Sequence, residues 1–543
     1  MKKLQLIENQ YENRALKDKT YQSFLKVINN MNLSKYLKNN PYCFETRGRK
    51  PYDKLNLLTA ILFASMNGIK SLRKMEDVFS YDTRFISILN EDQPTYVTIS
   101  NFISDNLLDS IHDIMTDMIM SFIDLGIDID LNTLYIDGTK IEASSNKYTW
   151  VWKKACIKFR DRLYIKISKD LKGLQRDVLD KYGILVNTKT EYYIEDIKSI
   201  VGFLDNKKEE NNLKYVYGKG RKKSKFQSYH DKFKHYYNKL ESYAIKIDLC
   251  GEFRNSYSKT DIDATFMRIK RDYMGNDALL PAYNLQAGVS DFFITHADVY
   301  QYASDSSTFV PFMEGYKKTY GFYPKYPVGD AGYGSFNNLI YCERNNMKKY
   351  LKFPSYKRET HDKKYIKDPF RVKNFKILED GSLLCPNNKR LVYWKEKAIA
   401  NNKYGRTTEL YRCVDCKGCN YKERCMKKAS NIYNNKVIQT NQEMTKYNEE
   451  VINNLGRPKG IRLRINRSIQ SEGAFGDIKS NYGYNRCRRK GIKKVRFEMI
   501  YEAIGHNLRR YRNIIINKEQ HDRDKLTIDS RYISNKVKQQ SFI

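Results

Sequence analysis

The sequence predicts an α/β protein built from several domains. Its 543 residues are too many for one hydrophobic core of ordinary size, and a hydrophobic fraction of 41% is enough for globular folding. Helical periodicity dominates the first 130 residues, whereas short β-like runs alternate with helical segments in the middle of the chain. These observations together favour several packed units around a mixed sheet.

The N-terminal unit, residues 1–130, is predicted to be helical. Apolar residues recur at helical spacing through 51–80, with a break at Asn67-Gly68. Basic residues accompany these helices at Arg47, Arg49, Lys50, Arg73 and Lys74. Two interpretations fit equally well: a helix-turn-helix-like DNA-binding unit, or a plain helical bundle with a basic surface.

The central part of the chain alternates strands and helices. A strand is predicted at 133–142, a long helical segment at 148–250, and a pair of strands at 282–299 with a hairpin turn at Ser290-Asp291. The next predicted elements are a helix at 306–320, a strand running into Asp330, a helix at 335–347, a strand at 349–353 and a closing helix at 497–516. This order matches an RNase-H-like core, in which the first and fourth strands are neighbours.

Three acidic residues stand in informative contexts. Asp137 lies in LNTLYIDGTKIEA, Asp330 in YPVGDAGYGS, and Glu472 in NRSIQSEGAFGDIKSNYG. An RNase-H-like core would place the two aspartates side by side, and a later helix would bring Glu472 to them. Carboxylates suit two Mg²⁺ or Mn²⁺ ions, which can clamp the attacking and leaving oxygens of a phosphodiester displacement. Asp137 would bridge both ions. Because 63 acidic residues are available, each one alone also fits a cap or a surface charge.

Basic residues surround the third acidic residue. Glu472 and Lys479 are seven residues apart, so on a helix they share a face, and Lys479 would steady the carboxylate or grip the scissile phosphate. A dense basic run at 486–496 and a second basic tract with tyrosines at 218–239 are typical of phosphate contacts. The structural alternative is a solvated helix face with salt bridges.

Charge indicates the class of partner. Lys and Arg number 98 against 63 Asp and Glu, a net charge of +35. We expect a polyanion as the partner, with nucleic acid the leading candidate, although a compositional bias contributes to the excess. The longest apolar run, 55–65, is far shorter than the roughly 20 residues of a membrane span, so no membrane partner is expected. A cytoplasmic, nucleoid-associated protein is therefore predicted.

A cysteine cluster indicates a second metal. The spacing C-x2-C-x2-C-x5-C is formed by Cys413, Cys416, Cys419 and Cys425, with Cys385 upstream. Close thiols favour structural Zn²⁺, held either by the local four or by Cys385 with three of them. The alternatives are part of an iron–sulfur pattern or reduced thiols without metal. His296 and His506 are expected to be structural. The sequence contains no P-loop motif, so it does not indicate an ATP-driven mechanism.

Several segments resemble one protein family. RGRKPYDKLNLLTAILFASMNGIKSLRKMED, YIDGTKIEASSNK, NSYSKTDIDATFMRIK with PAYNLQAGVS and VGDAGYGS, and NRSIQSEGAFGDIKSNYGYNR are similar to blocks of bacterial insertion-sequence transposases. The resemblance is to the DDE, RNase-H-like superfamily, in its IS-four-like branch and the group called IS-eleven-eighty-two. These blocks span most of residues 47–510.

The resemblance implies catalytic roles for four residues. Asp137, Asp330 and Glu472 match the metal-binding catalytic triad, and Lys479 matches the basic residue that follows the Glu. The branch often carries an Arg four residues before the Glu. Here that position is Ser468, with Arg467 one residue earlier.

The fold expectation is an α/β multidomain protein with an RNase-H-like mixed-sheet catalytic core. The expected parts are a helical N-terminal DNA-binding domain (1–130), the first core strand (131–147), a basic helical insertion (148–260), the continued core (261–354), an inserted Cys-cluster subdomain (355–460), core helices carrying the catalytic Glu (461–516) and a polar tail (517–543).

The expected function is that of a metal-dependent DNA transposase. It would bind the terminal inverted repeats of its element, cut there and join the ends to target DNA, as a homodimer on double-stranded DNA. The alternatives are an inactive or repurposed transposase that acts as a sequence-specific DNA-binding protein, and an RNase-H-like nuclease that cleaves without joining.

Overall fold

The protein is represented by a computed structural model that describes residues 14–38, 51–218, 220–269, 278–399, 402, 404–426 and 434–516. The predicted basic residues at 47–50, Cys43 and the tail at 517–543 lie outside the described residues. The fold is mixed α/β, as predicted.

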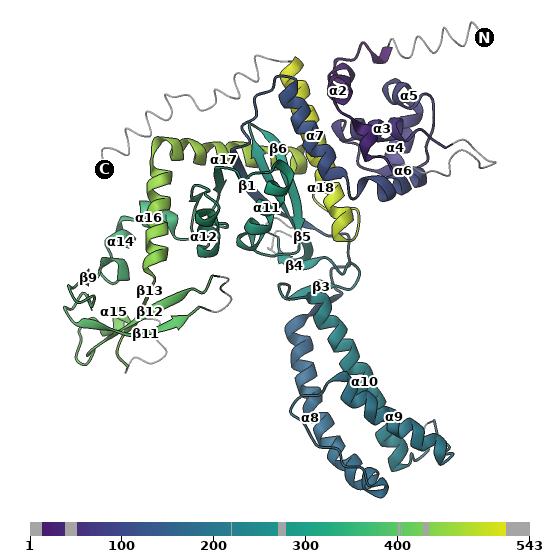
Figure 1. Cartoon of the computed structure of the whole chain (residues 1–543), viewed down its shortest axis with the longest axis vertical. Coiled ribbons are helices and arrows are strands. Elements are labelled where there is room, and N and C mark those ends of the chain that lie inside the picture. Colours follow the sequence, from purple (N-terminus) through teal and green to yellow (C-terminus); the bar gives the residue numbers. More distant parts are fainter. Residues whose placement is uncertain are drawn as a thin grey trace.

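A six-stranded mixed sheet forms the centre of the molecule (Figure 1). Its strands are β1 (Thr133–Glu142), β4 (Thr265–Arg268), β5 (Leu279–Ser290), β6 (Phe293–Tyr300), β7 (Tyr326–Gly329) and β8 (Tyr350–Leu351). Across the sheet the order is β6-β5-β1-β7-β8, and β4 pairs with the beginning of β5. β1 is antiparallel to β5 and parallel to β7, and β7 is parallel to β8. The strands predicted in this region are all present.

The β5–β6 hairpin shows how local sequence sets this sheet. The two strands are joined by Asp291 and Phe292, both with positive φ, at 46° and 71°. Such a two-residue turn matches the right-handed twist of the flanking strands. The predicted hairpin is therefore confirmed, but its turn lies one residue later than the predicted Ser290-Asp291, because Ser290 is the last residue of β5 and pairs with Phe293. The two strands are almost completely buried.

Helices of the core connect and cover the strands. They are α11 (Asp305–Tyr320), α12 (Phe336–Arg344), α16 (Gln442–Gly456), α17 (Pro458–Gly476), the π-helical η5 (Asp477–Asn481) and α18 (Ile492–Ile516). α17 packs against β1, and α18 packs against β6. α17 therefore joins the centre of the sheet to the C-terminal helix.

The N-terminal unit is helical within the described residues. Its elements are α2 (Lys19–Asn29), η1 (Leu33–Tyr36), α3 (Lys54–Met66), α4 (Leu72–Tyr81), α5 (Thr83–Leu89), α6 (Tyr96–Phe102), η2 (Ile103–Leu107) and α7 (Ile111–Asp124). α3 ends at the predicted break, where Gly68 has a φ of +68°. This helix is buried on nearly every side because α18 packs against it. The bundle therefore shares a core with the C-terminal helix.

A helical arm projects from the central sheet (Figure 1), and in the sequence it lies between β1 and β4. It contains α8 (Lys153–Asp177), η3 (Leu179–Tyr182), α9 (Ile194–Glu210) and α10 (Lys225–Cys250), which pack around a hydrophobic core of their own. At its base β2 (Trp150–Trp152) pairs with β3 (Ser256–Ser258). The prediction of helix throughout 148–250 was wrong at 150–152, where three bulky residues favour a strand.

A second sheet lies in the region predicted as an inserted Cys-cluster unit. Its five antiparallel strands are β9 (Lys376–Ile377), β10 (Leu383–Leu384), β11 (Arg390–Ala398), β12 (Thr407–Cys413) and β13 (Val437–Thr440). The short helices α13 (Tyr356–His361), α14 (Lys363–Ile366), η4 (Val372–Asn374) and α15 (Lys422–Cys425) surround it. No helix in the part of the chain that the structure describes is long and apolar enough to cross a membrane.

Candidate active site

Two adjacent strands carry the first two predicted acidic residues. β1 and β7 run parallel, and their register pairs Tyr135 with Val328. Asp137 comes two residues after Tyr135, and Asp330 comes two residues after Val328. The two aspartates therefore lie at the same level, where β7 ends. This is the side-by-side placement that the predicted strand order requires.

Arg467 of α17 joins the two aspartates. Its Nη2 atom lies 2.6 Å from Asp137 Oδ1 and 4.0 Å from Asp330 Oδ2. Its Nε atom donates to the carbonyl oxygen of Ile136 at 3.4 Å. One guanidinium therefore pairs with both carboxylates, leaves one net negative charge when both are ionised, and fixes α17 against β1.

Asp137 is a buried carboxylate with other charged side chains close to it. Burial raises its pKa, the Arg467 charge lowers it and the Asp330 charge raises it again, with a net result of about 6. A carboxylate that is costly to ionise is stabilised when a cation is placed beside it. The pair is therefore suited to a metal ion.

Asp305 is a further carboxylate near this site, which the sequence analysis did not single out. It begins α11, just after β6. Its Oδ1 atom accepts hydrogen bonds from Asn284 Nδ2 at 2.8 Å and Gln286 Nε2 at 3.2 Å. Gln286 pairs with Gly138, the residue after Asp137, so Asp305 is anchored on the face of the sheet opposite to the Asp137 side chain. Its charge contributes to the raised pKa of Asp137. The available signal was an acidic residue directly after a predicted core strand.

Glu472 is not grouped with the aspartates. It is exposed on α17 and accepts a hydrogen bond from Ser468 Oγ at 2.9 Å. Arg467, five residues earlier, faces about 140° away around the helix and takes the position against β1. The structure therefore brings Asp137 and Asp330 together and leaves Glu472 on a neighbouring face of the same helix.

Lys479 reaches the sheet by a route that the sequence did not predict. α17 ends at Gly476, and Lys479 lies in the π-helical turn η5, so the expected straight-helix face shared with Glu472 does not form. Its ammonium donates instead to Thr139 Oγ1 on β1. Thr139 and Asp137 are two residues apart and share one face of the strand. Lys479 is thus placed beside the aspartates.

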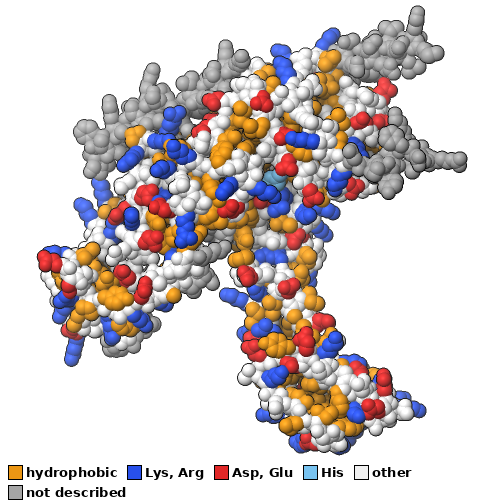
Figure 2. All heavy atoms as spheres, viewed as in Figure 1, with side chains coloured by type: hydrophobic (Ala, Val, Ile, Leu, Met, Phe, Trp, Pro, Cys, Tyr) orange, Lys and Arg blue, Asp and Glu red, His pale blue; other side chains and the backbone are white. Residues whose placement is uncertain are grey.

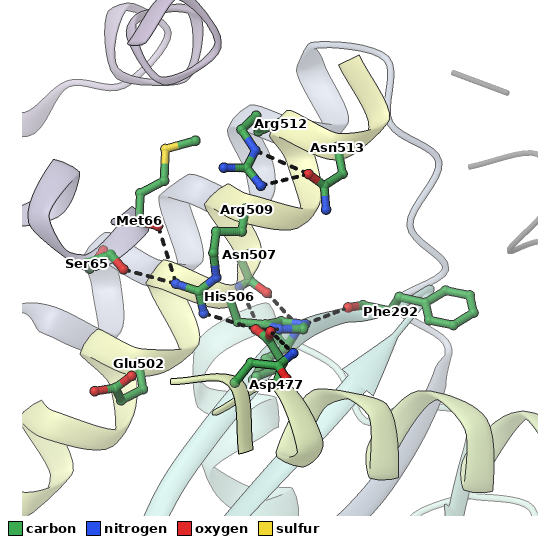
Figure 3. Close-up of polar contacts among 12 residues, drawn as sticks. Ser65, Met66, Phe292, Asp477, Glu502, His506, Asn507, Arg509, Arg512 and Asn513 are labelled. Carbon is green, nitrogen blue, oxygen red and sulfur yellow. Dashed lines mark hydrogen bonds and ion pairs between the residues drawn. The ribbon is translucent and has the colours of Figure 1, made fainter. Parts of the chain in front are cut away.

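A polar clamp fixes η5 against α18 (Figure 3). Asp477 Oδ2 accepts hydrogen bonds from His506 Nδ1 at 2.9 Å and Arg509 Nη2 at 3.0 Å, and His506 Nε2 lies 3.1 Å from the carbonyl oxygen of Phe292. Burial alone would raise the pKa of Asp477, but His506 and Arg509 hold it well below its usual value. These contacts give His506 the structural role expected for it.

The described residues of the two predicted metal sites are not arranged as the ligands of a metal ion. Among the described residues, no group of three or more His, Cys, Asp or Glu side chains is arranged to hold a metal ion. At the acidic site the guanidinium of Arg467 occupies the position between the two aspartates.

The five clustered cysteines line one small cavity of about 30 Å³ beside the second sheet. Cys416 Sγ accepts a hydrogen bond from the backbone N–H of Lys436 at 3.3 Å, and Cys419 Sγ accepts one from Asn387 Nδ2 at 3.4 Å. Cys413 Sγ instead donates to the carbonyl oxygen of Asp415 at 3.5 Å. The remaining two cysteines are Cys385 and Cys425. Burial raises the pKa of the Cys413 thiol.

The tract at 218–239 is less available to DNA than its composition indicates. Lys232 and Lys234 pair with Asp170 and Asp205 of the arm. The hydroxyl of Tyr236 also donates to Asp170. On the face shown in Figure 2, acidic and basic side chains are mixed over the arm. These contacts favour the structural interpretation of this tract.

The run at 486–496 is mixed in character. Arg496 pairs with Asp298 at 2.5 Å and Arg489 lies 3.8 Å from Glu498, so both arginines are used inside the fold. Lys490 and Lys494 are exposed. The exposed lysines of this run therefore remain candidates for phosphate contacts.

Two family models match the chain. Residues 384–512 match a model described as Transposase DDE domain, and residues 9–105 match one described as Transposase domain (DUF772). The first range contains Glu472, Lys479 and the cysteine cluster, whereas Asp137 and Asp330 lie outside both ranges. These matches support a DDE transposase. No curated protein and no solved structure matched the chain.

Proposed function

We propose that the protein is a metal-dependent DNA transposase that cuts DNA at the ends of its own element and joins those ends to target DNA. The observation that carries the proposal is that Asp137 and Asp330 lie side by side on the adjacent parallel strands β1 and β7. Both aspartates are ion-pair partners of Arg467. The two transposase family matches favour the same chemistry.

The central sheet supports an RNase-H-like assignment for the core. Three antiparallel strands in the order β6-β5-β1 are followed across the sheet by the parallel strands β7 and β8. In this assignment β1 and β7 are the first and fourth core strands, and the arm is an insertion after the first. The finer placement in the IS-four-like branch, IS-eleven-eighty-two group, rests on the sequence resemblance.

Asp137 and Asp330 would hold two Mg²⁺ or Mn²⁺ ions, with Glu472 as the third acidic ligand. Bound metal supplies positive charge to the attacking and leaving oxygens of a phosphodiester. Arg467 occupies the position between the two aspartates and must release them before a cation can bind there. Its guanidinium is then free to bind a DNA phosphate bidentately.

Glu472 reaches this site only if α17 shifts or its side chain leaves Ser468. Lys479, which donates to Thr139 two residues from Asp137, would contact the scissile phosphate. We therefore propose that the acidic triad is completed when DNA and metal bind.

DNA binding would involve the N-terminal helices and the exposed basic residues of the core. A net charge of +35 supports a nucleic-acid partner. Acting on two element ends would require two copies of the chain, and the projecting arm is a candidate contact between copies or with DNA (Figure 1).

The cysteine cluster would hold one structural Zn²⁺ through Cys385, Cys416, Cys419 and Cys425. Five cysteines in one cavity and N–H donors at two sulfurs fit such a site. Cys413 is left out because its thiol donates a hydrogen bond. Metal analysis should give about one Zn per chain. The metal should be lost in Cys416→Ser and kept in Cys413→Ser, and equal content in both variants would contradict this ligand set.

The function is tested by Asp137→Asn with a duplex that carries the element end. The substitution removes a metal ligand and no phosphate contact, so cleavage should fall by at least about a thousandfold while the DNA affinity stays within a few fold. Asp124→Asn, at the exposed end of α7, is the matched control and should cleave normally. Normal cleavage by Asp137→Asn would exclude this active site.

A further inference from the structure

We propose that Lys352 and Arg464 form a phosphate-binding subsite beside the aspartate pair, which holds the DNA backbone phosphate next to the scissile one. The inference rests on the proposed function, because it places a further part of the DNA substrate at the same site. Lys352 lies outside both matched family ranges, and the sequence analysis assigns no role to either residue.

The first argument is the position of Lys352 in the central sheet. β7 and β8 run parallel, and their register pairs Val328 with Tyr350. Asp330 and Lys352 each come two residues later, and the backbone N–H of Lys352 still donates to β7 at 3.2 Å. Asp137 lies at the same level on the other side of Asp330. Asp137, Asp330 and Lys352 therefore form a row across three adjacent strands, on the face that α17 covers.

The second argument is the glycine-containing loop that holds Lys352 in this row. The loop follows Asp330, and a Cβ atom on Gly334 would clash with the carbonyl oxygen of Lys352. Glycine in such a place allows two backbones to approach closely. The backbone itself therefore fixes Lys352 next to Asp330.

The third argument is that both cations lack an anionic partner. Lys352 is partly buried, yet its ammonium forms no hydrogen bond or ion pair with the described residues. Arg464 lies on α17, three residues before Arg467, and its Nη1 atom donates to the hydroxyl of Tyr356 at 3.4 Å. Within the part of the chain that the structure describes, Arg464 has no carboxylate at ion-pair distance. Two positive charges are therefore available at this end of the row.

The surroundings make these charges costly without a ligand. Burial lowers the pKa of Lys352, and the charges of Arg464 and Arg467 lower it further. The charge of Asp330 raises the pKa but does not offset them. An anion placed between Lys352 and Arg464 would relieve both the burial and the repulsion.

A DNA phosphate is the anion that fits this position. Neighbouring strands lie about 5 Å apart, so the backbone of Lys352 is about 10 Å from that of Asp137. This separation directs the ammonium to a phosphate beside the one that reacts at the aspartates. A lysine ammonium binds phosphate as a point charge, and an arginine adds paired N–H donors. The subsite would therefore hold the DNA strand in place on one side of the scissile bond.

The test is cleavage in Mg²⁺ of element-end duplexes that each carry one neutral methylphosphonate in place of a backbone phosphate. Wild type should lose at least about tenfold in cleavage rate at one phosphate next to the scissile bond. Lys352→Gln should be slower by a similar factor on the unmodified duplex. It should lose nothing further at that phosphate, because the contact is already gone. Lys352→Arg should restore part of the rate.

Two controls separate phosphate binding from a structural role. Lys232→Gln removes an arm lysine that pairs with Asp170, and it should match wild type on every duplex. Without DNA, Lys352→Gln should melt no lower than wild type, because its ammonium has no partner to lose among the described residues.

The outcomes distinguish this inference from the proposed function. If wild type cleaves but Lys352→Gln loses as much as wild type at every modified phosphate, the inference is overturned and the proposed function stands. A wild-type rate of Lys352→Gln on the unmodified duplex would overturn it in the same way. If wild type does not cleave the unmodified duplex, the proposed function is overturned and this inference with it.

Discussion

At the scale of single residues, the guanidinium of Arg467 is the group that contacts both aspartates of the candidate active site. Arg467 bridges Asp137 and Asp330, so the protein itself supplies one positive charge to the two carboxylates. On the same helix, Glu472 accepts a hydrogen bond from Ser468. If the two aspartates bind metal as proposed, their ion pairs with Arg467 compete with that binding.

The pKa of Asp137 predicts a pH-dependent metal requirement. At a pKa of about 6, raised chiefly by burial, the carboxylate is mostly ionised at pH 7 and mostly protonated at pH 5. A metal ion needs the ionised form. The Mg²⁺ concentration for half-maximal cleavage should therefore be about tenfold higher at pH 5 than at pH 7. A requirement that is independent of pH over this range would contradict the buried state of Asp137.

The Asp477 clamp predicts a stability effect. Asp477→Asn should lower the free energy of unfolding by about 3 kcal/mol, because it leaves the mostly buried Arg509 and His506 without their anionic partner. The pKa of Asp477 is depressed, so this contribution is present above the unfolded pKa of about 3.8 and is lost as the pH falls toward the folded value. Urea unfolding at pH 7 measures it. Asp124→Asn should change stability by less than about 0.5 kcal/mol.

At the scale of elements, α18 ties the N-terminal helices to the sheet through a close approach of backbones. A Cβ atom on Gly505 would lie 2.3 Å from the carbonyl oxygen of Ser65 on α3. Arg509 donates to this same carbonyl oxygen of Ser65, and Tyr501 donates to the carbonyl oxygen of Ile69. This contact makes the C-terminal helix part of the N-terminal core.

Gly505 and Gly473 form a matched pair of helical glycines. Gly505→Ala should destabilise the protein by about 3 kcal/mol, because the backbone of α3 cannot yield like a flexible side chain. Gly473→Ala on α17 meets nothing within 4 Å and should stabilise it by about 0.5–1 kcal/mol. Urea unfolding of both variants measures the difference. Equal stabilities would contradict the α3–α18 contact.

The elements that the sequence predicts and those that it misses differ in their pattern of apolar residues. β1, β5, β6 and β7 are predictable because their apolar runs end in Gly, Asp or turn residues. The second sheet was missed because β11 is exposed at eight of its nine positions and carries no alternating apolar face. The shared edge of Asp137 and Asp330 follows from strand order. The rotation of α17 and the anchoring of Asp305 depend on tertiary packing, which no local pattern records.

At the scale of the whole molecule, the basic residues that give the net charge of +35 have different roles in different parts of the chain. Many lysines of the arm pair with its own acidic residues, so they contribute to folding more than to DNA binding. The projecting arm and the second sheet are the two parts that stand away from the central sheet (Figure 1). Contacts with DNA are therefore expected mainly on the core and the N-terminal helices.

DNA affinity should depend steeply on salt. If six or more phosphates are neutralised, affinity should fall at least about a thousandfold between 50 and 200 mM salt. Replacing the exposed Lys490 and Lys494 by Ala should reduce the slope by about two. Replacing Lys232 and Lys234, which pair with Asp170 and Asp205, should leave it unchanged. Titrations by fluorescence anisotropy at several salt concentrations measure the slopes, and equal slopes in both double variants would contradict this division.

The most direct test of the proposed activity is cleavage and joining in Mg²⁺ of a duplex carrying the flanking ends of this gene. Wild type is compared with Glu472→Gln. We expect joined products from wild type and none from the variant, because Glu472 completes the metal site once DNA is bound. Cleavage without joining by wild type would indicate a nuclease, and binding without cleavage would indicate a DNA-binding regulator. Joined products from Glu472→Gln at the wild-type rate would contradict the acidic triad.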